Sequence, residues 1–331
     1  MLRWSILLSR TRTVDMTGVM QKRSTLVLGT RGSKLAVHQS EWVQARIQEL
    51  VPHVTVTLRR IHTSGDRILD VPLAKIGGKG LFVKEIEDAL LSGEIDLAVH
   101  SMKDVPTELP PGLDLLCIPF REDARDALIS RDGKRFKDLP SRARVGTSSL
   151  RRQAQLLQAR PDLSISMLRG NLDTRLRKLR EGQFDAIVLA AAGLRRLGWE
   201  REITEYLAPE ISLPAIGQGA LGIEGRRDDI FVRDVLSRLE HAPTRTTVMA
   251  ERALLRRLQG GCQVPIAAHA TIAGAEVVLE GLVASVDGKE VIRDRVTGTA
   301  DDPGSMGIQL AERLLARGGD RILQAIYGKV P

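Results

Sequence analysis

The sequence predicts an α/β protein of two lobes around a hinged cleft, followed by a small α+β domain. Strand-like and helix-like segments alternate through two long stretches, and two proline- and glycine-rich passages connect these stretches. The C-terminal part of the chain changes to paired strands and helices. Two connections between two α/β lobes are typical of a hinge, and such clefts hold ligands between the lobes.

The first lobe begins with the strand-like segment TLVLG, which leads through TRGS into a helix. One face of that helix carries the apolar residues Leu35, Trp42, Val43, Ile47 and Leu50. VTVTLRRI predicts the next strand, GGKGLFVKEIEDALLSG predicts a glycine turn and a helix that ends at Gly93, and IDLAVHS predicts a buried strand. The proline-rich VPTELPPGLDLLCIP then predicts the segment that leaves this lobe.

The second lobe begins near Asp123. DALIS, ARVGTS, LSISML and FDAIVLA predict strands, with one helix after ARVGTS and a second over 172–181. Alternating strands and helices of these lengths predict a parallel sheet that is covered on both faces. APEISLPAIGQGALGI leads out of this lobe, and its last part, QGALGI, predicts a strand that rejoins the first sheet.

The third domain follows His241, with a helix over 243–258 and then the loop GGCQVP. The strands EVVLEGLVAS and KEVIRDRVTG are joined by a VDG turn, and a helix over 306–315 follows. The predicted organisation is therefore an N-terminal extension at 1–24, a first domain at 25–119 and 219–240, a second at 120–218 and a third at 241–331.

The extension at 1–24 is rich in basic residues and hydroxyls, with Asp15 as its only acid. This composition resembles a weak organelle-transit segment, but a disordered extension or an upstream start before Met16 or Met20 explains it equally well. We exclude the extension from the fold. We expect a cytoplasmic protein, and an organelle stroma stays open.

Composition restricts the class of protein further. No run approaches the roughly 18 apolar residues of a membrane span, and the net charge of +8 favours anionic partners. Aromatic residues make up only 3%, without a finger or RNP-like pattern, which disfavours nucleic acid. Cys117 and Cys262 lie far apart and outside any CxxC, so we expect a reducing compartment; the six histidines lack metal-ligand spacing, so we expect no metal.

Basic and hydroxyl residues recur at the turns that follow the predicted strands, where open α/β sheets bind ligands. These turns are TRGSK at 30–34, HSMKD at 100–104, TSSLRR at 147–152 and RGN at 169–171. Each turn alone is also typical of a capped helix with solvated charges. Arg151 and Arg152 lie in the first turn of a helix, where a cation is unfavourable unless an anion joins it. Arginine forks bind carboxylates, so the pattern predicts a ligand with several carboxylates.

Two further residues allow more than one interpretation. Asp104 is either an Asx-turn residue before Pro106, or a carboxylate that stabilises developing positive charge and shuttles a proton. Cys262, in the loop GGCQ, is either a structural cysteine or a nucleophile or covalent anchor. Cys117, within LLCIP, is expected in the core. GGKGLF lacks the spacing of a nucleotide-binding loop, and a mobile glycine lid that carries Lys79 fits it better.

At these residues the sequence resembles the hydroxymethylbilane synthase family, also called porphobilinogen deaminases. The matching blocks are GTRGSKLA, GGKGLFVKEIE, AVHSMKDVPT, REDARDA, GTSSLRRQ, LRGNLDTRL, LPAIGQGALGIE and GGCQVPIA, in order from Leu26 onward. The resemblance implies two lobes like a periplasmic binding protein and a small third domain. It also implies a transferase that joins four porphobilinogen units head to tail, releases ammonia each time and passes hydroxymethylbilane to the next pathway enzyme.

The resemblance also assigns roles to residues of this chain. Cys262 would carry a dipyrromethane cofactor through a thioether. This cofactor is itself made from substrate. Asp104 would contact pyrrole nitrogens and assist the loss of ammonia, and Arg151 and Arg152 would hold cofactor acids, so that their loss yields apoprotein. Lys103, Ser101, Thr147 and Ser149 match further cofactor-binding positions. Substrate-binding positions match Arg31, Ser33, Arg169, Arg175 and Gln218, with Lys75, Lys79 and Phe82 in the glycine lid.

Two other functions remain open at this point. A non-catalytic two-lobed receptor for small polycarboxylates would share the cationic cleft but would need neither Asp104 nor a modified Cys262. A nucleic-acid-binding protein would show an outward basic face and a steep salt dependence. The sequence departs from some relatives at Ala267-Ala268-His269, which affects only the expected packing there. A monomer is expected.

Overall fold

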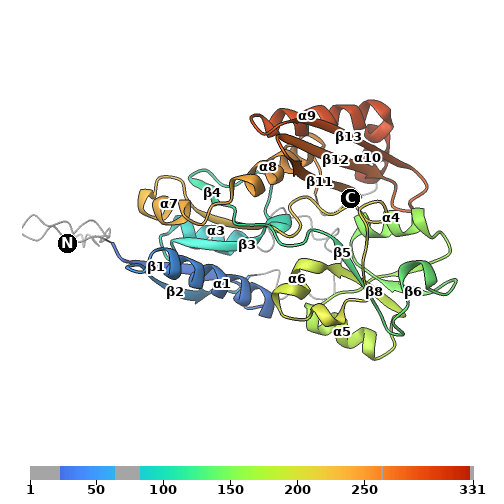
Figure 1. Cartoon of the computed structure of the whole chain (residues 1–331), viewed down its shortest axis with the longest axis horizontal. Coiled ribbons are helices and arrows are strands. Elements are labelled where there is room, and N and C mark those ends of the chain that lie inside the picture. Colours follow the sequence, from blue (N-terminus) through green and yellow to red (C-terminus); the bar gives the residue numbers. More distant parts are fainter. Residues whose placement is uncertain (1–22, 64–82, 262–263, 329–331) are drawn as a thin grey trace, which may run out of the picture.

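Three β-sheets, each with its own helices, make up the computed structural model of the chain (Figure 1). The structure describes residues 23–63, 83–261 and 264–328. No helix in those ranges is long and apolar enough to span a membrane. The first and second sheets have five strands each and the third has three.

The first sheet holds the N-terminal strands and one strand that returns from much later in the chain. In spatial order its strands are β2 (Thr55–Arg60), β1 (Thr25–Thr30), β3 (Leu97–Ser101), β10 (Leu221–Arg226) and β4 (Leu113–Cys117). Its helices are α1 (Lys34–Leu50), α3 (Lys84–Leu91) and α7 (Ile230–Ser237). Leu26, Leu28 and Ile223 of the sheet pack with Val43 and Ile47 of α1, so these two residues of the predicted apolar face form the core. The prediction is wrong for Trp42, which is 39% exposed.

The second sheet is built from the middle of the chain. In spatial order its strands are β7 (Ser164–Ser166), β6 (Arg144–Gly146), β8 (Ala186–Ala190), β5 (Asp126–Ser130) and β9 (Glu205–Tyr206). Its helical segments are η3 (Phe136–Asp138), α4 (Leu150–Ala159), α5 (Leu172–Arg180), α6 (Ala191–Arg196) and η4 (Glu200–Glu202). Two apolar clusters, one around Leu128 and one around Ile187, make its core.

The prediction of a parallel sheet is wrong for one strand in the second lobe, and the first lobe shows the same feature. β5 runs antiparallel to β8, with Asp126 opposite Ala190, and β10 runs antiparallel to β3, with Leu221 opposite Ser101. Both strands are entered from a segment that crosses between the lobes. They therefore begin at the edge where their neighbours end, which puts the two crossings and the carboxyl ends of the other strands together.

The third sheet is antiparallel, in the order β11 (Ile266–Ala273), β12 (Glu276–Ala284) and β13 (Val291–Thr299). It packs with α8 (Ala242–Arg257), α9 (Pro303–Leu314), the π-helical turn η5 (Leu315–Gly319) and α10 (Asp320–Tyr327). The predicted α+β character is thus present, while β11 and α10 were not predicted. Figure 1 shows α8 between the first sheet and the other helices of this part of the chain.

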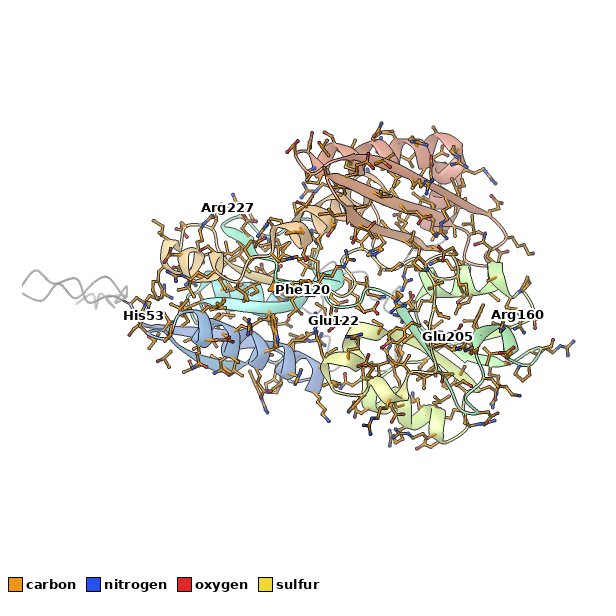
Figure 2. All side chains as sticks on the ribbon, viewed as in Figure 1. His53, Phe120, Glu122, Arg160, Glu205 and Arg227 are labelled. Carbon is orange, nitrogen blue, oxygen red and sulfur yellow. The ribbon has the colours of Figure 1, made fainter. Side chains whose placement is uncertain are left out.

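Two crossing segments connect the lobes, at 118–125 and 207–220. Phe120 and Glu122 of the first crossing lie near the middle of the molecule (Figure 2). The stretch 105–119, predicted to be a connecting segment, contains β4, so the crossing itself is shorter. In the second crossing Gly217 and Gly219 have φ of 69° and 89°, which side chains rarely adopt.

The buried carboxylate of Glu251, on α8, ties both crossings to the third sheet. Arg121 of the first crossing donates to it from Nη1 at 2.6 Å, the N–H of Gly217 in the second crossing at 2.7 Å, and the N–H of Ala270 in β11 at 2.8 Å. Although burial favours the neutral acid, Arg121 and His269 hold the pKa of Glu251 at about 2. One ionised side chain therefore fixes the three parts of the chain where they meet.

Candidate functional site

A cavity of about 530 Å³ lies where strand ends of the first two sheets meet the second crossing. The turn after β1 and the start of α1 line it from one side, and the turns after β7 and β8 line it from the other. Ligands of open α/β sheets bind at such strand ends. The predicted cleft between two lobes is therefore present.

Nine of the predicted site residues line this cavity. They are Arg31, Ser33, Ser101, Lys103, Asp104, Arg152, Arg169, Arg175 and Gln218. Thr147, Ser149 and Arg151 do not line it and lie directly behind it. Lys75, Lys79, Phe82 and Cys262 lie outside the described residues, so their predicted roles remain predictions.

The lining is strongly cationic. The lining contains two acids, Asp104 and Asp173, and seven Lys or Arg residues. The cations are Arg31, Lys34, Lys103, Arg152, Arg169, Arg175 and Arg196. Burial lowers the pKa of Arg175 to about 10, reinforced by Arg152 and opposed by Asp104. The side chain of Lys103 is partly accessible, yet burial of its amine also lowers its pKa. The nearby charge of Asp104 opposes this shift. Positive charge that is desolvated and crowded in this way is stabilised by an anionic ligand.

Arg196 is a lining cation that the sequence analysis missed. Its Nη2 donates to the carbonyl of Gly219 in the second crossing at 2.6 Å, and burial lowers its pKa to about 10 despite an opposing effect of Glu122. Arg195, the preceding residue on α6, instead pairs with Glu122 and Glu200 at the surface. The sequence does not distinguish these two adjacent arginines, because a pair of charged residues on a short helix is usually solvent-exposed.

Asp104 ends the short 3₁₀ turn η2 (Met102–Asp104) that follows β3. Its neighbours Met102 and Val105 are buried, whereas Asp104 is exposed to the cavity. An Asx turn would require a backbone N–H that donates to its carboxylate, and no such bond occurs within the described ranges. The geometry therefore favours the interpretation of Asp104 as a carboxylate directed at a ligand.

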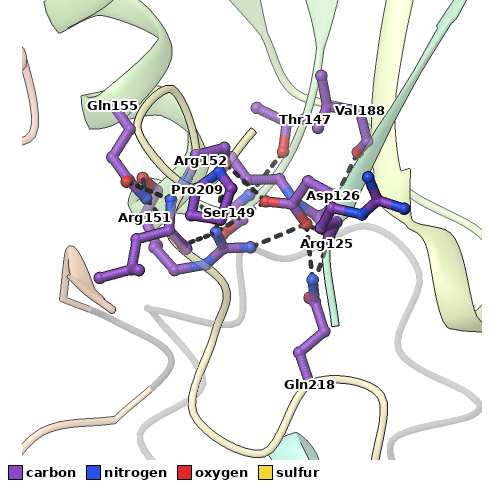
Figure 3. A network of polar contacts seen from close by, with 12 residues as sticks. Arg125, Asp126, Thr147, Ser149, Arg151, Arg152, Gln155, Val188, Pro209 and Gln218 are labelled. Carbon is purple, nitrogen blue, oxygen red and sulfur yellow. Dashed lines mark hydrogen bonds and ion pairs between the residues drawn. The ribbon is translucent and has the colours of Figure 1, made fainter. Parts of the chain in front are cut away.

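Arg151 and Arg152 explain how cations are tolerated at the start of α4. Ser149 caps the helix and accepts from the N–H of Arg152. Both guanidinium groups bind the buried carboxylate of Asp126, at 2.8 Å from Arg151 Nη1 to Oδ2 and 2.8 Å from Arg152 Nη2 to Oδ1 (Figure 3). The anion beside both arginines is therefore a protein side chain, whereas the sequence analysis expected a ligand carboxylate there.

Asp126 is satisfied from several elements at once. Gln218 of the second crossing donates to Oδ1 at 2.9 Å (Figure 3). Ser212 donates to Oδ2 at 2.7 Å. Burial favours the neutral acid, but the two guanidinium groups hold the pKa of Asp126 well below its ordinary value. The network fixes Arg152 at the cavity wall, and it leaves Arg151 bound to Asp126 and to the carbonyl of Leu213 at 2.6 Å.

The other predicted residues have clear local roles. Thr147 accepts from the N–H of Ser149 at 3.2 Å, so these two hydroxyls shape the turn before α4. Gln39, on α1, donates to the hydroxyl of Ser101 at 3.2 Å and holds it at the cavity. Cys117 is fully buried, as expected for a core residue, and burial raises the pKa of its thiol. No group of three or more candidate metal ligands occurs in the described part of the chain.

Comparisons with known proteins identify the family of the chain. The model of the family described as "Porphobilinogen deaminase, dipyromethane cofactor binding domain" matches residues 26–234, and that of the "Porphobilinogen deaminase, C-terminal domain" matches 245–316. The porphobilinogen deaminase of Pelobacter propionicus is 60% identical over 91% of this chain and 97% of its own length. That of Geobacter sulfurreducens is 56% identical over 91% and 95%.

Solved structures with similar folds are more distant. The VFT2 domain of BvgS from Bordetella pertussis is 15% identical over 66% of this chain and 88% of its own, with a TM-score of 0.39. An arginine-specific periplasmic binding protein of Salmonella typhimurium is 15% identical over 65% and 91%, also with a TM-score of 0.39.

Proposed function

Since the chain belongs to the porphobilinogen deaminase family, we propose that the cationic cavity between its lobes is the active site of that reaction. The enzyme is a transferase of tetrapyrrole biosynthesis. It condenses four porphobilinogen molecules head to tail, releases ammonia at each step and produces hydroxymethylbilane. The alternative of a non-catalytic receptor is not favoured, because relatives that are 60% and 59% identical over more than nine tenths of the chain carry the enzyme's name.

The cofactor of the family is dipyrromethane, and the cavity fits it chemically. Two linked porphobilinogen units carry four carboxylates, and the lining supplies an excess of desolvated cations for them. When bound, the group supplies the pyrrole carbon to which the first substrate is joined. We assign its carboxylates to Lys103 and Arg152 with the hydroxyl of Ser101, and its covalent attachment to Cys262.

Further cations of the cavity suit the acids of incoming substrate. Arg31 and Ser33 project from the first lobe, while Arg169 and Arg175 project from the second, so a carboxylate between the lobes can be bound from both sides. The Nε of Arg175 donates to the carbonyl of Gly170 at 2.7 Å, which orients its fork. We add Arg196 to this set. Gln218 acts through Asp126, and Lys75, Lys79 and Phe82 are proposed to act from the glycine lid.

Asp104 is proposed to carry the chemical step. The leaving amine of porphobilinogen departs as ammonia, and the methylene carbon and pyrrole ring left behind become positively charged. A carboxylate beside that ring stabilises the charge as it forms, and a positioned acid can also move a proton between successive steps.

Arg151, Thr147 and Ser149 are proposed to support cofactor binding indirectly. Arg151 neutralises one oxygen of Asp126 and the two hydroxyls shape the turn before α4, so the fork of Arg152 is held at the cavity. Loss of Arg151 or Arg152 is therefore expected to leave apoprotein.

We also propose a cytoplasmic monomer that passes its product to the next enzyme of the pathway. The curated relatives reported above are bacterial. The buried thiol of Cys117 suits a reducing compartment.

The single observation that carries the proposal is the presence of Asp104 and the desolvated cations in one cavity. Intact-mass measurement of purified protein tests it. We expect an added mass of two pyrrole units that is absent from Cys262→Ala and retained by Cys117→Ala, together with release of ammonia from porphobilinogen. An active enzyme without the added mass would overturn the cofactor assignment.

A further inference from the structure

Two arginines of α8 bind the backbone that follows Asp104. Nη1 of Arg252 donates to the carbonyl of Val105 at 3.1 Å, and its Nη2 donates to the carbonyl of Pro106 at 2.6 Å. One turn later on the same helix face, Nη2 of Arg256 donates to the carbonyl of Thr107 at 2.7 Å. Three consecutive carbonyls directly after Asp104 are thus bound by a helix of the third domain, from more than 140 residues away in sequence.

Burial of the charged guanidinium of Arg252 is unfavourable, and its hydrogen bonds to these carbonyls offset the lost hydration only in part. Arg252 is 8% exposed, and burial, with a contribution from Arg256, lowers its pKa to about 10. No carboxylate pairs with it among the described residues; its contacts are the two carbonyls and the sulfur of Met102, which lies 3.9 Å from Nη1. A buried cation without a partner is expensive, and an apolar side chain would serve stability better. The position therefore calls for a role other than packing.

The loop that Arg252 binds has few hydrogen bonds of its own. The last backbone bond of the 3₁₀ turn that ends at Asp104 runs from the N–H of Val105 to the carbonyl of Met102 at 3.1 Å. Pro106 has no N–H to donate, and Val105 is extended before it. Lys103 and Arg175 attract the carboxylate of Asp104, but no hydrogen bond to it fixes its direction among the described residues. The direction of this side chain thus depends on how the backbone on either side is held.

We propose that Arg252 is a positioning residue for Asp104, which rests on the catalytic role assigned to Asp104 above. Arg252 fixes the carbonyls of Val105 and Pro106, and thereby fixes the turn from which the carboxylate enters the cavity. Arg256 completes the clamp at Thr107. The helix α8 belongs to the third domain and also carries Glu251, which binds both crossings. The orientation of Asp104 is therefore set by the same helix that holds the lobes together.

Steady-state kinetics of cofactor-loaded protein test the proposal. We expect Arg252→Met to lower kcat by about 10- to 100-fold while KM changes by less than about threefold, since small displacements of a catalytic group cost rate rather than binding. Arg252→Lys keeps the positive charge but loses the forked guanidinium. Its kcat should therefore lie between those of Arg252→Met and the wild type. Arg257→Met is the matched control, because Arg257 lies on the same helix and pairs with Glu312 at the surface.

A double-mutant cycle distinguishes positioning from a general structural role. If Arg252 acts through Asp104, then adding Arg252→Met to Asp104→Glu should lower kcat by less than about threefold, well below its effect in the wild type. Equal fold-losses in both backgrounds would overturn the proposal. An unchanged kcat in cofactor-loaded Arg252→Met would also overturn the proposal, even if Asp104→Glu is impaired. An unimpaired Asp104→Glu would instead refute the role of Asp104 itself.

Arg256→Met covers the case in which Arg252→Met fails to fold. It releases only the carbonyl of Thr107 from a more exposed side chain. A smaller fall of kcat, by roughly threefold, with unchanged KM supports the clamp. Unchanged kcat in both Arg256→Met and Arg252→Lys would contradict it.

Discussion

The guanidinium of Arg152 lies 2.8 Å from the carboxylate of Asp126, inside the second lobe and directly behind the cavity wall. Arg151, the preceding residue, binds the other oxygen of the same carboxylate at 2.8 Å. One acid thus pairs with both cations that begin α4, and it also accepts from Gln218 of the second crossing. The wall of the cavity and the hinge are therefore joined through a single buried group.

Asp126→Asn should destabilise the protein by about 3–5 kcal/mol, because it leaves two buried guanidinium groups without their counter-charge. Urea unfolding at pH 7 measures this change. Since Arg151 and Arg152 lower the pKa of Asp126, its contribution is present above its ordinary pKa of 3.8 and is lost only as the pH falls below that value. Asp162→Asn, which affects an exposed pair with Arg160, is the control and should change stability little. Equal effects would contradict the network.

Asp104→Asn should lower turnover by at least about 100-fold while folding survives, because the substitution preserves shape and removes the charge that faces the reacting ring. Ammonia release measures turnover, and circular dichroism with thermal unfolding checks the fold. Asp114→Asn, at an exposed acid near Arg227, serves as the control. Near-normal turnover of Asp104→Asn would refute the assignment.

Arg196→Gln should lower kcat/KM by roughly 10- to 100-fold, the effect of losing one charge-assisted hydrogen bond to a substrate carboxylate, about 1.5–3 kcal/mol. Arg195→Gln is a closely matched control on the same helix, because that side chain pairs with Glu122 and Glu200. Only Arg196→Gln should be impaired. Similar kinetics for both would remove Arg196 from the site.

Glu87, on α3, should make the protein less stable as the pH rises from 4.5 to about 7. Burial and the nearby carboxylate of Glu224 raise its pKa from 4.5 to about 7, with a smaller contribution from Asp88 and opposition from His100. The folded state therefore keeps a proton that the unfolded chain releases over this range, and stability falls until the folded group also ionises.

Glu87→Gln removes that dependence. Relative to the wild type, the variant should gain free energy of unfolding between pH 5 and pH 8, measured by urea unfolding at both values. Glu94→Gln, at an exposed acid that pairs with Arg59, should keep the dependence of the wild type. If wild type and Glu87→Gln lose stability in parallel over this range, then Glu87 does not hold the proton.

Local sequence patterns predicted much of the fold. The strand QGALGI rejoins the first sheet as β10, and the basic turns after β1, β3 and β7 do converge on one cavity. Each of these features follows from a short segment with its own hydrophobic period or turn residues. β11 was missed because IAAHATIA is rich in alanine and lacks the β-branched alternation of its neighbours.

What the sequence could not predict depends on contacts between distant segments. Asp126 looked like the polar start of a strand, and only the folded sheet places it against Arg151 and Arg152. The antiparallel direction of β5 and β10 follows from where the two crossings enter the sheets, and residue periodicity does not encode direction. Arg252 lies ten residues before Cys262 in a helix rich in arginine, and nothing local distinguishes it from its solvated neighbours.

A crystal structure of the purified, loaded enzyme tests the central claim most directly. We predict a dipyrromethane joined to the sulfur of Cys262, with its carboxylates on Lys103 and Arg152 and with pyrrole nitrogens within hydrogen-bond distance of Asp104. A group bound away from this cavity, or an unmodified sulfur in an active crystal, would contradict the account.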